Sequence, residues 1–238
     1  MRASTRETVA PVTFFFGARH ERSFQLSPED SHHAVRVLRR APGDLIWCID
    51  GSGSAFEVVI TEADVRSAVG SIEREHTWFN EPSGRLELLC GMTQPARLDW
   101  VVEKATELGL HELRPLLGPS PAGPGRVRRW SRIARGAAKQ CRRGFVPRIH
   151  EPQSLVAHLE QLEPGGRRLC AEASGARLGM GERWEGRLIL AVGHDSGFSA
   201  AELSLLNEAG FEPVSLGDRR LRTETAVVAL LAQVEAWG

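Results

Sequence analysis

The sequence predicts an α/β protein with two domains, a small strand-rich one followed by a larger one built on a mostly parallel sheet. Two observations predict this arrangement. Up to about residue 75, short apolar runs are separated by turns, whereas from residue 85 onward strands and helices alternate. The length of 238 residues suits one or two domains. Hydrophobic residues at 42% and charged residues at 25% exclude a disordered or collagen-like chain.

The first domain is expected to be a small β-barrel with one helix. Strands are predicted at residues 12–16, 45–49 and 56–61, where β-branched and aromatic residues are bounded by turns. Before the second strand, Ser27 and Pro28 predict a helix start, because serine caps the first turn and proline suits its first position. The polar segment 73–84 is interpreted as a linker. We therefore expect a barrel domain at 1–75, a linker at 76–84 and a second domain at 85–238.

The second domain should contain strands at residues 85–90, 112–117, 168–173, 187–192 and 214–216. Helices are expected at residues 98–108, 127–141, 154–162, 199–210 and 223–236. Ser199 and Glu202 form a capping box, and Thr223 is expected to cap the last helix. Alternation of this kind predicts a parallel sheet with helices on its faces.

The net charge of the chain is zero, but the charges are unevenly distributed along the sequence. Residues 113–150 contain no Asp or Glu but hold ten of the thirty basic residues. Within this stretch, apolar residues recur at helical spacing from Val127 to Cys141, and arginines cover the rest of the helix. Like charges four residues apart cost a few tenths of a kcal/mol per pair. The pattern favours a surface that binds a polyanion such as RNA or DNA, although a plain solvated face is the alternative.

The spacing of the cysteines argues against a metal site, and the hydropathy argues against a membrane protein. The four cysteines lie far apart in the sequence: Cys48, Cys90, Cys141 and Cys170. The adjacent His32 and His33 would point in different directions, which makes them poor metal ligands. We interpret the cysteines as small buried hydrophobes and expect no metal. The apolar runs are shorter than the roughly 18 residues of a membrane span, and the N-terminus does not resemble a signal peptide. We expect a cytoplasmic protein with no membrane partner.

Two glycine-bearing segments are candidates for a ligand site. Residues 193–197 and 217–225 each follow a late strand, and ligands of open α/β sheets gather at the carboxyl ends of strands. Neither segment has the spacing of a dinucleotide fingerprint or a P-loop. On pattern alone they are either a ligand site or ordinary turns. A small-molecule α/β enzyme would also fit, but it leaves the acid-free helix unexplained.

The segment 221–225 is the densest in groups capable of chemistry. One interpretation is structural: Thr223 caps the helix, Glu224 favours the helix dipole and Arg222 pairs with Glu224. The other interpretation is catalysis by the same residues.

Several blocks of the sequence, taken together, carry a resemblance to a known family. The most specific are GHDSGFSAAE at 193–202 and LGDRRLRTETA at 216–226. Others are KATELG at 104–109, the pattern from Trp130 to Pro147, and Val37-Leu38-Arg39 with Gly43. Over nearly the whole chain, and in order, these blocks resemble the RsmE-type 16S rRNA uridine-N3 methyltransferases.

The resemblance implies an N-terminal PUA-like RNA-binding barrel and a C-terminal SPOUT-type α/β methyltransferase domain with a trefoil knot. It implies a homodimer that methylates N3 of a uridine with S-adenosylmethionine, acting on 16S rRNA or the small ribosomal subunit. The cofactor-binding residues would be Gly193, Gly197, Leu216, Gly217, Leu221 and Thr225. The RNA-binding residues would be Arg36, Arg39, Arg132, Arg135, Lys139 and Arg143.

The N3 nitrogen of uridine is protonated at neutral pH, so the reaction needs a proton acceptor and a group that stabilises negative charge. We expect Arg222 to donate to the developing oxyanion, and Glu224 or Asp195 to accept the proton. The first loop departs from the Gly-Pro-Glu-Gly-Gly of the family. If Ser196 had to adopt a positive φ, it would cost about 1 kcal/mol or more. This departure motivates the alternative of a degenerate RNA-binding homologue without methyl-transfer activity.

Overall fold

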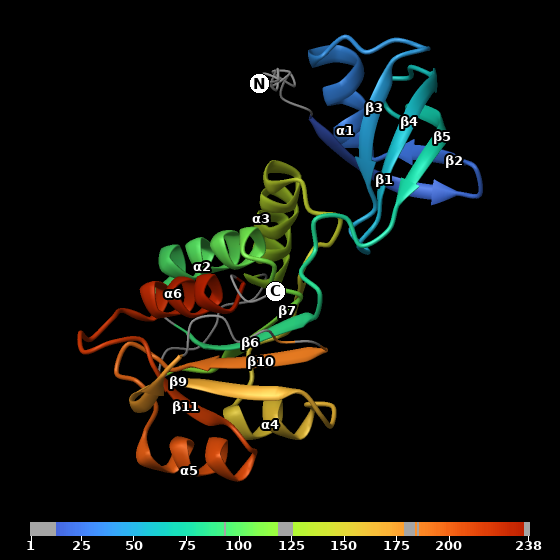
Figure 1. Ribbon diagram of the computed structural model, residues 1–238. Coiled ribbons are helices and arrows are strands. Elements are labelled where there is room, and N and C mark those ends of the chain that lie inside the picture. Colours follow the sequence, from blue (N-terminus) through green and yellow to red (C-terminus); the bar gives the residue numbers. More distant parts are fainter. Residues whose placement is uncertain (1–12, 93, 119–125, 179–183, 185, 236–238) are drawn as a thin grey trace, which may run out of the picture. The chain divides into compact units, whose positions relative to one another are not determined.

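The computed structural model of the chain describes residues 13–92, 94–118, 126–178, 184 and 186–235 (Figure 1). The chain divides into two compact units. One comprises residues 1–80 together with 139–145, and the other comprises 81–138 and 146–238. The short segment 139–145, at the end of the basic helix, thus belongs to the N-terminal unit.

The N-terminal unit is a closed barrel with the strand order β1-β2-β5-β4-β3. The strands are β1 (Phe14–His20), β2 (Ser23–Leu26), β3 (Leu45–Ile49), β4 (Ala55–Glu62) and β5 (Val69–His76). Neighbours run antiparallel except β1 and β3, which close the barrel in parallel. The interior is filled by apolar side chains such as Phe15, Phe24, Phe56, Val58 and Ile60. Closure pairs every strand of this sheet on both sides, which confirms the predicted barrel.

The predicted helix start in the barrel is confirmed. In α1 (Pro28–His32) the Ser27 hydroxyl accepts a hydrogen bond from the backbone N of Asp30 at 3.2 Å. The Asp30 carboxylate in turn accepts a hydrogen bond from the backbone N of Phe16 at 2.9 Å, which fastens the helix to β1. The chain continues as a π-helix, η1 (His33–Val37).

The polar segment after residue 73 does not begin as a linker, because β5 continues to His76. Glu57 of β4 lies opposite Arg74, with 3.4 Å between Oε1 and Nη1, and its Oε1 lies 2.8 Å from Nε2 of His76. Polarity here marks the solvent face of a strand rather than a loop.

An aromatic cluster lies on the outer face of the barrel, because Phe14 and Trp47 alternate with the interior residues Phe15 and Cys48. The ring centroid of Phe79 lies 6.0 Å from that of Phe14 and 5.4 Å from that of Trp47. Trp78 adopts a positive φ of 53° and contacts Phe145 at 6.3 Å. These contacts explain why the 139–145 segment belongs to the barrel unit.

The C-terminal unit is built on a six-stranded sheet with the order β11-β9-β10-β6-β7-β8, in which every pairing is parallel. Its strands are β6 (Arg85–Gly91), β7 (Glu112–Leu116), β8 (Arg148–Ile149), β9 (Arg167–Arg177), β10 (Arg187–Val192) and β11 (Glu212–Ser215). The predicted parallel sheet is therefore confirmed.

Helices cover both faces of this sheet, with α2, α3 and α6 on one side and α4 and α5 on the other (Figure 1). They are α2 (Pro95–Glu107), α3 (Arg126–Cys141), α4 (Leu155–Glu160), α5 (Ala200–Glu208) and α6 (Thr223–Glu235). Side chains of successive strand residues point to opposite faces of the sheet. Leu88 packs in the core on the side of α2, α3 and α6, and Leu89 packs in the core on the side of α4 and α5. The capping box of Ser199 and Glu202 is present at the start of α5, as predicted.

A buried ion network lies where the strands of this sheet begin. Glu87 of β6 pairs with Arg187 of β10 at 2.5 Å and with Arg114 of β7 at 3.4 Å. Glu112 of β7 pairs with Arg114 at 2.9 Å and with His150 at 2.8 Å. The hydrogen bond with His150, helped by the nearby arginines and opposed by burial, lowers the pKa of Glu112 to about 2. Its ion pairs connect the three neighbouring strands β10, β6 and β7.

Candidate functional site

A cavity of about 520 Å³ lies at the carboxyl edge of the parallel sheet. Its walls are residues 171–173 of β9, residues 192–197 after β10, and residues 216–221 after β11, with Thr223 and Ala226 of α6. Because β11, β9 and β10 are neighbours in the sheet, their carboxyl ends meet there. The volume falls within the range of small-molecule and cofactor sites, roughly 300–1,000 Å³. The two glycine-bearing segments therefore form one site.

Glycine is required in these loops by backbone geometry. Gly197 has a φ of +85° and Gly217 a φ of +111°, a conformation that side chains rarely adopt. At Gly193 a Cβ atom would lie 2.7 Å from the backbone carbon of Gly197, so the loop closes on itself. The cavity wall is thus largely backbone, which brings amide and carbonyl groups close to a bound molecule.

The two loops are fastened to each other by hydrogen bonds. The Thr223 hydroxyl lies 3.2 Å from the carbonyl oxygen of Gly193 and 3.2 Å from Oδ1 of Asp195. Arg220 donates from Nη2 to the backbone oxygen of Asp195 at 3.0 Å. The prediction that Thr223 caps α6 is wrong: Thr223 is the first residue of the helix, and its hydroxyl is used across the site.

A guanidinium group that sequence reasoning missed lies between two acids of the site. Nη1 of Arg97, from α2, lies 3.6 Å from Oδ2 of Asp195, and its Nε lies 3.5 Å from Oε1 of Glu224. The expected pairing of Arg222 with Glu224 is wrong, because Glu224 faces α2 instead and Arg222 is exposed. The other carboxylate oxygen of Glu224, Oε2, is buried and has no hydrogen-bond partner among the described residues.

A buried thiol lies close to these two acids. Burial, with smaller contributions from Asp195 and Glu224, raises the pKa of Cys90 to about 12. Cys90 is the penultimate residue of β6 and is buried, as are Cys48 and Cys170. The thiol is neutral at physiological pH, so it adds no charge to the site.

The structure brings most of the predicted cofactor residues together. Those lining the cavity are Gly193, Gly197, Leu216, Gly217 and Leu221. Asp195 lines it too, whereas Thr225 and Arg222 are exposed and are not among its walls. Ser196 does not adopt a positive φ, so the strain considered for this loop does not arise. Sequence reasoning missed Glu172 and Arg220, which line the cavity from β9 and from the second loop.

The residues predicted to bind RNA have different surroundings. Arg36, Arg39, Arg132 and Arg135 are exposed. Lys139 pairs with the buried Asp30 within the barrel unit. Arg143 is only 3% exposed. Contact with RNA stays a prediction for all six.

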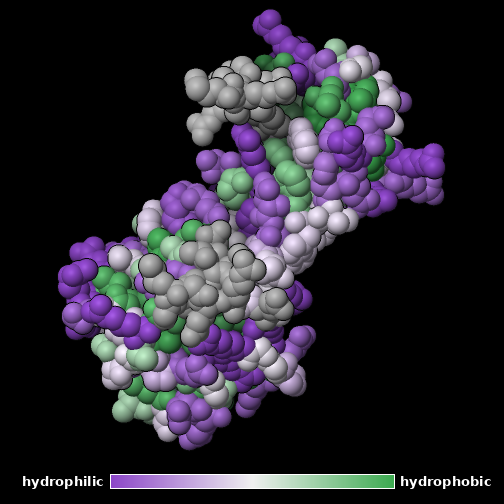
Figure 2. All heavy atoms as spheres, viewed as in Figure 1, coloured by the Kyte–Doolittle hydropathy of each residue, from purple (hydrophilic) through white to green (hydrophobic). Residues whose placement is uncertain are grey.

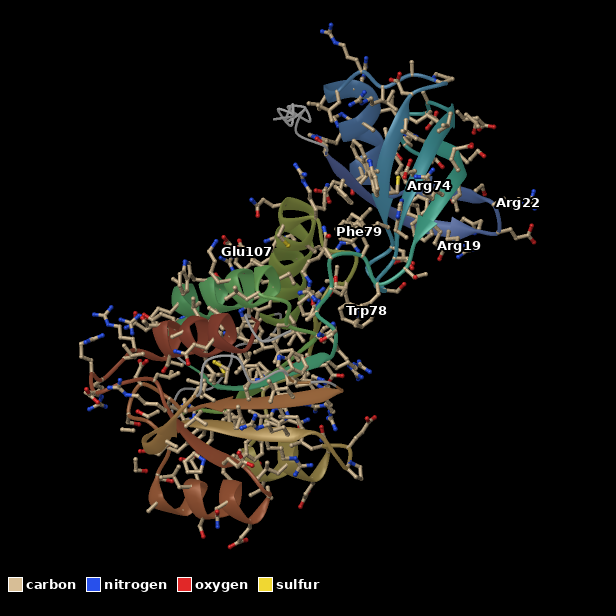
Figure 3. The ribbon with its side chains drawn as sticks, viewed as in Figure 1. Arg19, Arg22, Arg74, Trp78, Phe79 and Glu107 are labelled. Atoms are coloured by element: carbon tan, nitrogen blue, oxygen red, sulfur yellow. The ribbon has the colours of Figure 1, made fainter. Side chains whose placement is uncertain are left out.

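Three further arginines extend from the barrel, and acids balance two of them. Arg19 of β1, Arg22 of the following turn and Arg74 of β5 point outward (Figure 3). Arg19 pairs with Glu75 at 2.7 Å, and Arg74 lies 3.4 Å from Glu57. Most of the surface in view is hydrophilic, with smaller apolar areas between (Figure 2). An acid reaches α3 as well, because Arg129 lies 2.7 Å from Asp99 of α2, so the presence of an acid does not rank the arginines of the barrel below those of α3.

Among the described residues we find no candidate for a membrane-spanning helix, since none combines sufficient length with low polarity.

A closed barrel, together with a parallel α/β domain that carries a glycine-lined cavity between two late loops, is the architecture of an RNA methyltransferase with a PUA domain. The RNA methyltransferase domain family matches residues 80–235, and the RNA methyltransferase PUA domain family matches residues 26–73. The chain belongs to the RNA methyltransferase domain family.

Relatives agree over nearly the full length. Ribosomal RNA small subunit methyltransferase E of Bacillus subtilis (strain 168) is 28% identical over 234 residues, covering 89% of each chain. The methyltransferase E structure from Neisseria gonorrhoeae bound to S-adenosyl methionine has a TM-score of 0.80 at 27% identity, covering 93% of this chain and 95% of that one. A probable rRNA-methyltransferase from Porphyromonas gingivalis has a TM-score of 0.80 at 30% identity, covering 95% and 98%.

Proposed function

We propose that the chain transfers a methyl group from S-adenosylmethionine to N3 of a uridine in 16S (small-subunit) ribosomal RNA. One observation carries the proposal: two loops that follow β10 and β11 form a single glycine-lined cavity with an acid at its wall. The small-subunit methyltransferase E relatives and the S-adenosyl methionine complex among them support it.

The residues present fit the methyl donor. The backbone around Gly193, Gly197, Leu216, Gly217 and Leu221 would hold its adenosine and methionine parts, with Thr225 nearby in sequence. Three carboxylates, of Glu172, Asp195 and Asp218, line the same cavity against two guanidinium groups, of Arg219 and Arg220, and this excess of one negative charge suits a ligand with a positive charge. When bound, S-adenosylmethionine supplies an electrophilic methyl group on a positively charged sulfur.

Side chains of this protein would convert N3 of the uridine into a nucleophile. N3 of uridine becomes nucleophilic when its proton leaves, and the negative charge then spreads onto O2 and O4. We assign proton acceptance to Asp195 or Glu224, and stabilisation of the oxyanion to Arg222, a type of interaction often worth several kcal/mol. The base must leave its stack to reach the cavity, as in other enzymes that modify bases.

The RNA would be held by the arginines of α3 and by the barrel. Arg128, Arg129, Arg132 and Arg135 are exposed, while Trp130 and Ala134 on the opposite side of α3 are buried. Arg129 pairs with Asp99 of α2 at 2.7 Å, so the other arginines of this face suit phosphates best. We assign residues 1–75 to RNA binding, 76–84 to a linker and 85–238 to methyl transfer, and we propose a cytoplasmic homodimer whose α/β domain is knotted.

The test is mass spectrometry of 16S rRNA, isolated from cells lacking this protein and then incubated with the purified protein and S-adenosylmethionine. We expect one N3-methylated uridine to be absent before incubation and present after it. An rRNA that gains no methyl group, with saturable S-adenosylmethionine binding also missing, would instead support a degenerate RNA-binding protein. Methylation at a ribose hydroxyl would exclude the N3 assignment.

A further inference from the structure

We propose that Arg97 is a positioning residue of this site, which holds Asp195 as the proton acceptor while Glu224 acts only through Arg97. The inference rests on the proposed function and deepens it, because it separates the roles of the two acids. It starts from the guanidinium of α2, which lies 3.6 Å from Asp195 and 3.5 Å from Glu224.

The two acids differ in their access to the cavity. Asp195 lines the cavity, and its side chain is 52% exposed. The Glu224 side chain is 15% exposed and is not part of the cavity wall, and its Oε2 is buried without a hydrogen-bond partner in the described part of the chain. A proton acceptor has to come within hydrogen-bond distance of the base, about 2.6–3.2 Å. Asp195 is open to a ligand in the cavity, and Glu224 is not.

Burial of the Glu224 carboxylate costs desolvation free energy, and this burial needs an explanation. A buried carboxylate oxygen without a partner is rare in folded proteins, because desolvation is not compensated. Its other oxygen faces the guanidinium of Arg97, whose charge cannot be removed at physiological pH. We infer that Glu224 orients Arg97, and that Arg97 in turn presents its Nη1 edge to Asp195.

The groups around Asp195 fit the role of acceptor. Arg97 of α2 and the Thr223 hydroxyl of α6 face its carboxylate, and Arg220 holds its backbone oxygen. His194 beside it is turned toward Met92, with 3.2 Å between Nδ1 and the carbonyl oxygen of Met92. Near Glu224 lies a further titratable group, the neutral Cys90 thiol. Arg97 is therefore the cation that both acids share.

In the step that follows, the N3–H bond breaks and its proton passes to a carboxylate oxygen of Asp195. The N3 electron pair forms the bond to the methyl carbon, and the pair of the broken sulfur–carbon bond remains on sulfur. Arg97 does not touch the substrate. It keeps the carboxylate fixed in direction until the proton arrives.

The experiment measures single-turnover methyl transfer to unmodified 16S rRNA between pH 5 and 9, at saturating S-adenosylmethionine. The variants are Arg97→Met, Arg97→Lys, Glu224→Gln and Asp195→Asn. Arg167→Met is the matched control, because Arg167 forms a similar ion pair with Glu212 at 3.6 Å where β9 begins. Equilibrium binding of S-adenosylmethionine and circular dichroism are recorded for each variant, so that a folding defect is recognised.

We expect Asp195→Asn to slow transfer at least 100-fold. Arg97→Met should slow it about tenfold, since the Asp195 carboxylate loses the group that holds its direction. Arg97→Lys should recover most of the rate, and Glu224→Gln should slow transfer less than Arg97→Met does. Arg97→Met, Arg97→Lys and Glu224→Gln should each bind S-adenosylmethionine within about threefold of the wild type, whereas Asp195→Asn, which removes a charge from the cavity wall, is compared at saturating S-adenosylmethionine.

Two results would overturn the assignment while leaving the proposed function intact. One is an Arg97→Met protein with the transfer rate of the wild type. The other is a Glu224→Gln protein that is slower than Asp195→Asn. A wild-type protein that transfers no methyl group would overturn the proposed function and this inference together.

Discussion

The hydroxyl of Thr223 lies 3.2 Å from the carbonyl oxygen of Gly193, although the two residues are 30 positions apart. This contact joins the first residue of α6 to the loop after β10, and it is buried. The cavity keeps its shape because the loops that form it are fastened to each other here. The bond therefore predicts which substitutions disturb ligand binding without disturbing the barrel.

Thr223→Val should weaken S-adenosylmethionine binding about 5- to 30-fold. The substitution leaves the carbonyl of Gly193 without its partner, which costs about 1–2 kcal/mol. Isothermal titration calorimetry measures the effect. Thr61→Val is the control, since Thr61 donates to Val69 at the same distance of 3.2 Å but lies in the barrel. Equal loss of binding in both variants would mean that the effect is not local.

Gly217→Ala should also weaken cofactor binding, through backbone strain. A side chain at a φ of +111° costs about 1–3 kcal/mol, and relief of this strain requires a change in the backbone of a loop that lines the cavity. Gly43→Ala is the matched control, because Gly43 has a φ of +94° and an added Cβ would likewise meet no described atom within 4 Å. We expect Gly43→Ala to lower the melting temperature and leave binding unchanged. Binding lost in Gly43→Ala would contradict this explanation.

Acid should destabilise the α/β domain through Glu112. Its pKa is about 2 in the folded protein against an ordinary value of 4.5, so it contributes stability above pH 4.5 that is lost as the pH falls toward 2. The contribution at pH 7 should be about 1–3 kcal/mol. Urea unfolding of wild type and Glu112→Gln between pH 3 and 7 checks it. The two curves should differ at pH 7 and approach each other at pH 3; a constant difference would contradict the assignment.

Two basic residues of α3 should respond differently to loss of charge. Lys139 pairs with Asp30, whose side chain is only 5% exposed, so Lys139→Gln leaves a buried carboxylate unpaired and should destabilise the protein by about 2–4 kcal/mol. Arg132 is exposed, so Arg132→Gln should keep stability and lower the slope of RNA affinity against salt concentration by about one. Melting curves and RNA titrations at several salt concentrations separate the two. A stable Lys139→Gln with weaker RNA binding would make Lys139 an RNA contact instead.

Local chemistry made most of the elements predictable. The Ser27 cap, the capping box of Ser199 and the apolar run of β10 each depend on neighbouring residues, and all three are confirmed. The interpretation of Glu73 as part of a linker was wrong, because polarity there has two possible causes, a loop or the outer face of a strand. Only the partner strand β4 decides between them.

Long-range contacts limited what could be predicted of the site. The glycines at 193, 197 and 217 mark positions where the backbone needs freedom, and they line the cavity as expected. The hydroxyl of Thr223 was assigned to the nearest helix, whereas its partner is on another loop. Arg97 has no local motif, and its role arises because α2 begins beside the carboxyl edge of the same sheet. Its position after β6 was the one available indication.

The most direct test of the account is hydrogen–deuterium exchange of the protein with and without S-adenosylmethionine. We predict slower exchange in the peptides that contain residues 193–197 and 216–222, and in no peptide of the barrel. Protection confined to other segments, or an exchange pattern that S-adenosylmethionine leaves unchanged at saturating concentration, would contradict the assignment of the cavity to the methyl donor.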